Sequence, residues 1–259
     1  MVKYKLSTLT RARHVNEPIS NIIYDGIGNI STWLIANFTK IGPNAVTTLG
    51  SLSGIISAYF FFTNQLFFGA IFYYMRHLSD CVDGRLSRLK GQGSKFGAWY
   101  ENYLGIHVSF LNIMAFCIGQ YFVTEKIMWL IFMPLLMHSF RMHNWSSMKA
   151  ALLLGDKFKE RVVKPSKGKN KEGFIDRIKN FLAKSGIAEP FNSADGMTIL
   201  FVLNPILGQL FGITFYVVLG WLVITAFKEV FWFFYYRNIL KKFDDEESKG
   251  KKGRSTFEK

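Results

Sequence analysis

Cysteine is nearly absent from this sequence, which has only Cys81 and Cys117 among 259 residues. Neither cysteine belongs to a Cys-x-x-Cys pair or to a cysteine–histidine spacing, which excludes a zinc or redox site built on thiols. Both lie in apolar segments at different depths, so we expect two buried thiols and no disulfide. A Walker loop, a dinucleotide-binding fingerprint and a serine nucleophile elbow are absent as well.

Acidic residues are scarce beside basic ones. The chain has 18 Asp and Glu against 32 Lys and Arg, for a net charge of +14. No nucleic-acid recognition motif accompanies this charge, so we expect no nucleic-acid partner. Hydrophobic residues make up 49% of the chain and are separated along it from the basic segments, which is typical of polytopic membrane proteins.

Six apolar segments are long enough to cross the ~30 Å hydrocarbon core of a bilayer at about 1.5 Å per helical residue. They are residues 44–63, 66–86, 97–122, 126–146, 195–213 and 215–236. The sequence therefore predicts an all-α polytopic membrane protein with six transmembrane helices. Of the 32 Lys and Arg residues, only Lys126 falls in a predicted outer loop, so we expect the N- and C-termini to be cytoplasmic.

The segments outside the spans divide the chain further. Residues 1–43 form a cytoplasmic N-terminus, in which residues 18–40 are amphipathic but too polar to span, as expected for a helix lying in the membrane interface. Residues 44–236 form the membrane domain, with a basic cytoplasmic loop at 147–194 whose lysines we expect to meet anionic membrane lipids. A specific anionic substrate is the alternative for these lysines. The mixed-charge tail, 237–259, is predicted to be disordered.

Three carboxylates interrupt the apolar segments near one predicted membrane boundary. Asp80 and Asp83 lie one turn apart at the end of the second span, and Glu101 lies near the start of the third. The link "RLKGQGSK", Arg88 to Lys95, is short, so the two helices are expected to be antiparallel neighbours on which these carboxylates converge. The glycines on the same faces, expected to let the two backbones approach closely, are Gly84, Gly97 and Gly105.

Converging carboxylates of this kind indicate a cation site. Oxygen ligands without His or Cys favour Mg²⁺, Mn²⁺ or Ca²⁺ over zinc. Basic residues follow the acids directly, among them Arg85 and Arg88, and metal-bound carboxylates beside basic residues are typical of a phosphate site, with a pyrophosphate as the natural ligand. The alternative is an interhelical salt-bridge network of the same acids with Arg88. Arg76, one turn before Asp80, is predicted to be a salt-bridge partner.

The same stretch resembles the signature of the CDP-alcohol phosphotransferases, membrane enzymes that move a phospho-alcohol from a CDP-linked donor to a hydroxyl acceptor. Their pattern is D-x-x-D-G-x-x-A-R, eight residues, then G-x-x-x-D-x-x-x-D, and the spacing here is intact. The corresponding residues are Asp80, Asp83, Gly84, Ser87, Arg88, Gly97, Glu101 and Gly105. "PNAVT", Pro43 to Thr47, also matches the family's Pro-Asn-x-x-Thr at the start of its first span.

The resemblance implies an enzyme that releases CMP from a CDP-alcohol donor as it transfers the phospho-alcohol to a lipid or polyol. It implies one or two Mg²⁺ or Mn²⁺ ions, a homodimer, and a site facing the cytoplasm from the cytoplasmic membrane. The implied metal ligands are Asp80, Asp83 and Glu101. The implied contacts of the CDP moiety are Asp80, Asp83, Gly84, Ser87, Arg88 and Gly97. The stretch from Arg85 to Trp99 is most similar to the branch acting on CDP-linked polyols, which includes di-myo-inositol-phosphate-type synthases.

The sequence departs from the family pattern at its last two acids. Glu101 replaces an aspartate, and Gly105 replaces the aspartate that the family uses as metal ligand and as base on the acceptor. In one interpretation Glu101 is both metal ligand and catalytic base. In a second, His107, His138 or Glu229 supplies the base. In a third, the chain binds nucleotide, lipid or a partner without turnover. A membrane transporter whose acids line an ion path is the least favoured alternative.

Overall fold

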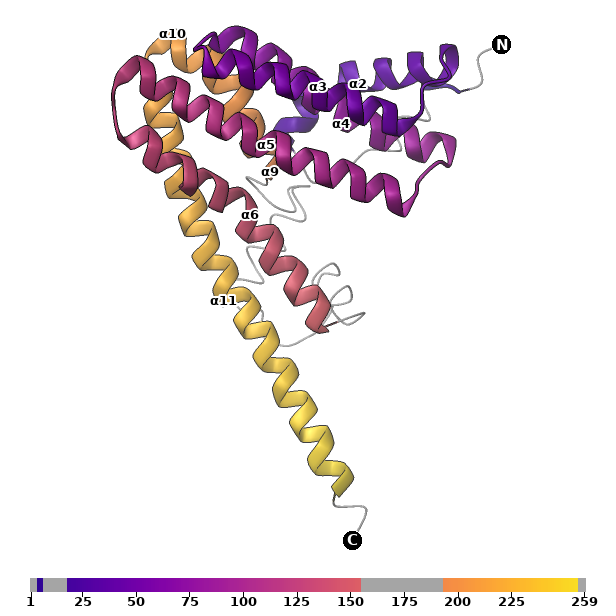
Figure 1. Ribbon diagram of the computed structural model, residues 1–259. Coiled ribbons are helices and arrows are strands. Elements are labelled where there is room, and N and C mark those ends of the chain that lie inside the picture. The colour runs from indigo at the N-terminus through magenta and orange to yellow at the C-terminus, as the bar shows by residue number, and fades with distance from the viewer. Residues whose placement is uncertain (1–3, 7–17, 155–192, 256–259) are drawn as a thin grey trace. The chain divides into compact units, whose positions relative to one another are not determined.

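The computed structural model describes residues 4–6, 18–154 and 193–255, and within them every regular element is a helix (Figure 1). The helices are α2 (Pro18–Phe38), α3 (Pro43–Phe62), α4 (Leu66–Lys90), α5 (Lys95–Thr124), α6 (Met128–Leu154), α9 (Ser193–Thr198), η3 (Ile199–Gly208), α10 (Gln209–Phe211) and α11 (Thr214–Ser255). This confirms the predicted all-α class.

The described residues fall into two compact units. The first comprises Met1–Met137 and Leu182–Gly220, and the second comprises His138–Phe181 and Trp221–Lys259. The predicted site residues from Pro43 to Gly105 all belong to the first unit. In the second unit, Phe140 stacks on Trp221 with ring centroids 6.0 Å apart.

Each of the six predicted apolar segments is helical in the structure. Within the described residues, four helical stretches are both long and apolar enough to cross a membrane, so the chain is an integral membrane protein. They are Pro43–Phe62, Lys95–Thr124, Ala194–Phe211 and Thr214–Asn238. Helices α4 and α6 have 25 and 27 residues, but charged or polar side chains occupy their second halves. The count of six spans and the orientation of the termini therefore remain predictions.

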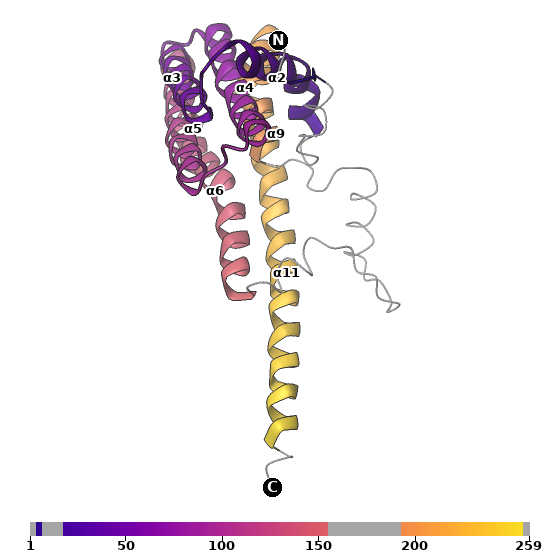
Figure 2. The same ribbon diagram turned by 90° about the vertical axis from the view of Figure 1, so that its right-hand side faces the viewer.

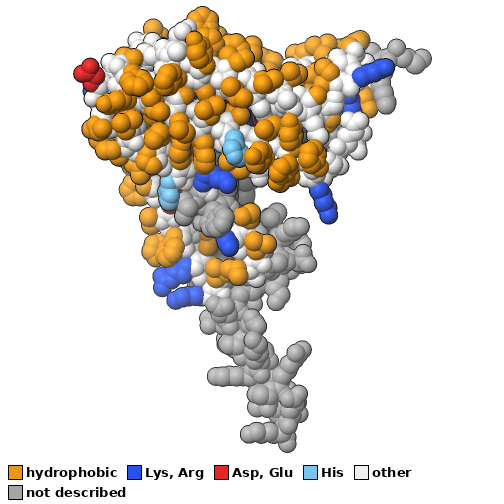
Figure 3. Space-filling view, viewed as in Figure 1, with side chains coloured by type: hydrophobic (Ala, Val, Ile, Leu, Met, Phe, Trp, Pro, Cys, Tyr) orange, Lys and Arg blue, Asp and Glu red, His pale blue; other side chains and the backbone are white. Residues whose placement is uncertain are grey.

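Apolar side chains cover much of the outer surface of α3 and α5 (Figure 3). Tyr59 and Phe122 are each more than 60% exposed, and Leu52, Ile56 and Leu111 are exposed as well. A water-facing helix would keep such side chains inside, whereas lipid tails solvate them without cost. The exposed surface is thus what a membrane-embedded helix pair requires.

Small residues hold α3 against its two neighbours. The Ser57 hydroxyl donates to the Gly69 carbonyl at 2.8 Å, and the Asn112 amide donates to the Gly54 carbonyl at 2.9 Å. A Cβ on Gly69 would overlap the Phe61 ring, and one on Gly119 would overlap the Phe61 carbonyl oxygen. These contacts fix the register of α3 against both α4 and α5, the three helices that carry the site.

Aromatic rings fill the centre of the first unit. Phe116 meets Phe61 edge-on with ring centroids 5.5 Å apart, and Phe201 lies 4.9 Å from Tyr73 by the same measure. Cys117 is buried beside this core, Cys81 is partly buried, and neither forms a disulfide within the described chain. The predicted burial is thus confirmed for Cys117 and holds only in part for Cys81.

The fifth predicted span contains a segment wider than an α-helix. Residues Ile199 to Gly208, η3, form a π-helix that contains Pro205. Proline has no N–H to donate and its ring clashes with an α-helical turn, and a π-helical turn is one way a helix accommodates such a break. Helical periodicity alone did not indicate this segment.

Helix α2 packs along α4, as the second view of the chain also shows (Figure 2). Tyr24 stacks on Tyr74 with centroids 4.9 Å apart, and Asp25 forms an ion pair with Arg85 of α4. The opposite face of α2 is apolar and exposed: Ile22, Ile27, Ile30, Leu34 and Phe38. The structure has a helix at the predicted position, and an N-terminal amphipathic helix lying in the membrane interface remains a prediction.

The C-terminal helix is longer than the sequence predicts. Helix α11 continues to Ser255 and so covers most of the segment at 237–259 for which we expected disorder. Lys and Glu, which dominate that segment, are good helix formers, and no proline interrupts them. The domain boundaries remain predictions, and residues 155–192 of the basic loop lie outside the described residues.

Replacing Gly119 by alanine should lower the thermal unfolding midpoint, because the added Cβ overlaps a main-chain carbonyl that cannot swing aside. Over-packing of this kind costs about 1–3 kcal/mol. Gly220→Ala is the matched control, since a Cβ there meets nothing within 4 Å. Thermal unfolding of the purified protein in detergent measures both variants. A midpoint for Gly119→Ala that equals that of Gly220→Ala would contradict this packing.

Candidate functional site

The first turn of α3 brings a hydroxyl to the α4 acids. Gly42 is extended and Pro43 opens the helix, a position where its missing N–H costs nothing. One turn later Thr47 is buried, and its hydroxyl donates to Asp83 Oδ2 at 2.5 Å. The Pro-Asn-x-x-Thr segment and the first acids of the signature therefore meet through a hydrogen bond.

A tight link then turns the chain from α4 into α5. Gly91 ends α4 with a left-handed φ of 63°, a conformation that glycine adopts without strain. Ser94 begins α5 as its N-cap, and its hydroxyl accepts from the Gly97 amide at 3.0 Å. The ends of α4 and α5 are thus held next to each other, as the length of the link predicts.

The expected close packing of α4 on α5 is wrong. Both helices pack against α3 instead, and they have little contact with each other. A Cβ on Gly97 would meet Asn44 Oδ1 at 3.1 Å, and one on Gly105 would meet the Arg76 guanidinium at 3.0 Å. These glycines therefore make room for polar side chains, because the first turn of α3 lies where a direct α4–α5 contact would be.

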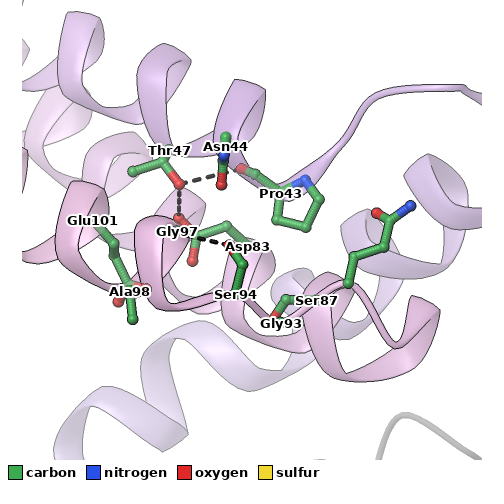
Figure 4. A pocket seen from close by; sticks show the side chains of 11 residues that line it. Pro43, Asn44, Thr47, Asp83, Ser87, Gly93, Ser94, Gly97, Ala98 and Glu101 are labelled. Carbon is green, nitrogen blue, oxygen red and sulfur yellow. Dashed lines mark hydrogen bonds between the residues drawn. The ribbon is translucent and has the colours of Figure 1, made fainter.

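A pocket of about 100 Å³ opens between α3, α4, the link and α5 (Figure 4). Asp83 and Glu101 line it from α4 and α5, and Thr47 lines it from α3. Its other lining residues are Pro43, Asn44, Ser87, Gln92, Gly93, Ser94, Gly97 and Ala98. We call it the larger pocket.

A second cavity of only about 10 Å³, the smaller pocket, shares Thr47, Asp83 and Glu101 with the larger one. Its other lining residues are Gly50, Ser51, Arg76, Ser79, Asp80 and Gly105. All three predicted metal-binding carboxylates thus line one cavity. The structure brings them together from two helices, at the place where the sequence suggested.

Asp83 is the buried member of the three acids. The residue is 2% exposed, and while Oδ2 accepts from Thr47, Oδ1 has no hydrogen-bond partner in the described chain. A buried carboxylate oxygen left without a donor is costly, and a cation would satisfy it. By ligand type, the oxygen-only donor set therefore fits a hard divalent ion. In the conformation described, however, no three His, Cys, Asp or Glu side chains among the described residues are close enough together to hold an ion.

The remaining signature residues divide between the pocket and its surroundings. Ser87 and Gly97 line the larger pocket. Gly84 and Arg88 line neither pocket, and the exposed Arg88 side chain lies 3.4 Å from where a Cβ on Gly84 would be. The Ser87 hydroxyl donates to the Gly84 carbonyl at 2.9 Å. The Arg88 guanidinium thus lies beside Gly84 at ordinary van der Waals distance.

Arg76 is a site residue whose role the sequence did not reveal. It lines the smaller pocket, and its guanidinium forms no ion pair within 4 Å of any described carboxylate. Asp80 and Asp83 attract it at longer range, so the predicted pairing with Asp80 is an attraction without direct contact. The side chain lies over the Tyr73 ring, 5.9 Å from its centroid, and reaches toward Gly105 of α5. The helical spacing of Arg76, Asp80 and Asp83 was the signal that placed it on the acidic face.

The other candidate bases lie elsewhere. His107 is exposed, lines neither pocket, and has Nδ1 2.8 Å from the Tyr103 carbonyl oxygen of its own helix. One ring nitrogen of His107 is therefore engaged by its own helix and not by the acids. His138 and Glu229 belong to the second unit, so their candidacy remains a prediction.

Comparison with known proteins agrees with the resemblance. Residues 40–151 match the family CDP-alcohol phosphatidyltransferase, and this segment includes every residue that lines the two pockets. Among curated proteins the chain is similar to the bifunctional IPC transferase and DIPP synthase of Aquifex aeolicus (strain VF5), with 31% identity over 105 residues. The aligned part is 40% of this chain and 22% of that protein, so the match spans less than a quarter of the relative's length.

Thr47→Val should destabilise the protein, because Asp83 then loses its hydroxyl donor inside the core. Leaving a buried acceptor without its partner costs about 1–3 kcal/mol. Thr48→Val is the matched control, since the exposed Thr48 hydroxyl contacts the Tyr100 hydroxyl at 3.0 Å and water can replace it. Thermal unfolding in detergent compares the two. An equal decrease of the unfolding midpoint in both variants would show that the Thr47–Asp83 hydrogen bond contributes no more to stability than the Thr48 contact.

Proposed function

We propose that this chain, whose residues 40–151 match the CDP-alcohol phosphatidyltransferase family, transfers a phospho-alcohol from a CDP-alcohol to a hydroxyl acceptor and releases CMP. The observation that carries the proposal is the buried Asp83 carboxylate, which lines both pockets with one oxygen unbonded. A carboxylate in that state is suited to a cation, and the family match specifies the kind of reaction. The chain spans too little of its curated relative for that protein's activity to be carried over whole.

Asp80, Asp83 and Glu101 would hold Mg²⁺ or Mn²⁺ in the smaller pocket. When bound, the cation neutralises the donor pyrophosphate and the charge that develops on departing CMP. Asp83 is already fixed for this task by Thr47 and by burial. Asp80 and Glu101 are partly buried, which leaves their carboxylates free to close on an ion.

The larger pocket is the proposed site of the CDP moiety. Ser87 and Gly97 lie in its wall, as the signature predicts, and Gly97 leaves space beside Asn44 and Ser94 that any side chain would fill. Arg88 is exposed over Gly84 at the same end of α4, where a flexible guanidinium is available to phosphate oxygens. Metal, pyrophosphate and cytidine would thus occupy the space from the smaller pocket to the larger one.

In the transfer step an acceptor hydroxyl oxygen bonds to the β-phosphorus of the CDP-alcohol. The bond between that phosphorus and the bridging oxygen breaks, and CMP leaves with the electron pair. The hydroxyl proton passes to a base, for which we propose Glu101, because its carboxylate lines both pockets and is partly exposed. Gly105 has no side chain to take this part.

The donor we favour is a CDP-linked polyol. Support comes from the similarity to the Aquifex IPC transferase and DIPP synthase and from the stretch between Arg85 and Trp99. The acceptor is a lipid or a polyol, and a homodimer in the cytoplasmic membrane, with its site facing the cytoplasm, completes the proposal. A second candidate function, binding of nucleotide without turnover, is favoured by Gly105 alone.

Release of CMP should require Mg²⁺ or Mn²⁺ and should be abolished by Asp83→Asn, which removes the charge from the buried ligand. The measurement uses the full-length protein in detergent with a panel of CDP-alcohols and polyol or lipid acceptors. Glu125→Gln removes one carboxylate charge at the exposed end of α5 and should leave the rate unchanged.

CMP release that persists in Asp83→Asn would exclude these pockets as the place where the reaction occurs. Metal-dependent CDP binding without turnover across the panel would support the second function instead. Ion flux through proteoliposomes without any nucleotide affinity would exclude both and restore the transporter interpretation.

Glu101→Gln should lower kcat by about 10²- to 10⁴-fold, since the loss of a general base typically costs that much. Glu101→Asp keeps a carboxylate one methylene shorter and should retain more activity. His107→Gln is the control for the alternative base and should have little effect, because the ring faces away from both pockets. A loss with His107→Gln as large as with Glu101→Gln would contradict the assignment.

A further inference from the structure

The Arg76 side chain passes close to two glycines. A Cβ on Gly105 of α5 would lie 3.0 Å from Arg76 Nη2, whereas a Cβ on Gly54 of α3 would first overlap the Val108 side chain and would lie 3.0 Å from Arg76 Cγ. The Tyr73 ring lies on another side of the guanidinium, 5.9 Å away. Residues of three helices thus surround the Arg76 guanidinium at the smaller pocket, beside the position where the family pattern has its last aspartate.

The charges that line the smaller pocket are those of Asp80, Asp83, Glu101 and Arg76. Three ionised carboxylates and one guanidinium sum to −2, which one divalent cation balances. An aspartate at position 105 with no guanidinium beside it would bring the sum to −4, which two divalent cations would balance. The exchange of a carboxylate for a neighbouring arginine therefore changes the charge of the pocket by the equivalent of one metal ion.

A guanidinium is suited to replace a metal ion at a phosphate. It stays protonated at all accessible pH values and binds two phosphate oxygens at once in a planar geometry. Asp80 and Asp83 attract the Arg76 guanidinium, but no described carboxylate lies within 4 Å of it, so its N–H donors remain available to a ligand. Asp83 Oδ1, buried and without a partner, independently marks the same pocket as a place for a ligand.

We propose that Arg76 supplies the positive charge of a second metal ion, so that the site binds a single divalent cation and uses Arg76 to bind a phosphate oxygen of the donor. This inference rests on the proposed function. An arginine cannot accept a proton, so deprotonation of the acceptor is left to a carboxylate, in agreement with the role given to Glu101. The missing side chain at Gly105 then provides the space that Arg76 requires, and no other residue has to replace the family's last aspartate as a metal ligand.

The test counts Mn²⁺ ions bound to the full-length protein in detergent with saturating CDP, by electron paramagnetic resonance of free Mn²⁺. The wild type should bind one Mn²⁺ per chain. Arg76→Gln should still bind one Mn²⁺, with CDP affinity about ten- to hundredfold lower, the usual effect of losing a charged hydrogen bond. The double variant Arg76→Gln/Gly105→Asp should bind two Mn²⁺ per chain.

Matched variants separate charge from shape. Arg76→Gln/Gly105→Asn places a neutral side chain of nearly the same size at position 105 and should bind one Mn²⁺. Gly105→Asp alone retains Arg76, is expected to pair with it, and should lower CDP affinity while the count stays at one. This last variant keeps the test decisive if removal of Arg76 prevents folding, which the thermal midpoint of each variant reports.

Two Mn²⁺ ions bound by the wild type, or CDP affinity unchanged in both Arg76→Gln and Gly105→Asp, would overturn the inference and leave the proposed function intact. If neither the wild type nor any variant shows CDP binding that depends on Mn²⁺, the proposed function itself fails. The two failures are therefore distinguishable by whether Mn²⁺ and CDP bind together at all.

Discussion

The hydrogen bond from Thr47 to Asp83 is the contact on which the candidate site depends. It joins the first turn of α3 to the acidic end of α4. Asp83 is the only fully buried acid in the site, and the bond engages its Oδ2 atom while Oδ1 has no partner in the described chain. Because α3 packs against both α4 and α5, this bond also determines where the two remaining carboxylates meet the pocket. The hydroxyl is thus both an anchor for a helix and the orienting group for a ligand.

The rest of the first unit keeps α3 in that position. Glycines at 54, 69 and 119 bring its neighbours close, and hydrogen bonds from Ser57 and Asn112 hold their register. Helix α2 braces α4 from the other side through Asp25 and Arg85, two residues beyond Asp83. Polar contacts inside a lipid-facing bundle are few, so each one restricts the geometry of the acids more than it would in a water-soluble protein.

Spacing in the sequence was enough to predict that Asp80, Asp83 and Glu101 share a cavity, because helical periodicity and a short link leave few other arrangements. It was not enough to predict which helices touch, since the side chain of Thr47 and the insertion of α3 depend on tertiary packing. The surroundings of Arg76 were predicted only in part for the same reason. Its neighbour in the helix, Asp80, suggested a salt bridge, while glycines far away in the sequence direct it toward α5. Nor did periodicity indicate the π-helix around Pro205.

Every residue that lines the two pockets lies between Pro43 and Gly105, on three consecutive helices and the link between the last two. A site of this kind is a single continuous block of gene sequence. Within the described residues, no more distant segment lines either pocket, so the candidate site can be copied or fused as one uninterrupted piece. The curated relative is much longer than the segment that it shares with this chain, which is about a fifth of its length.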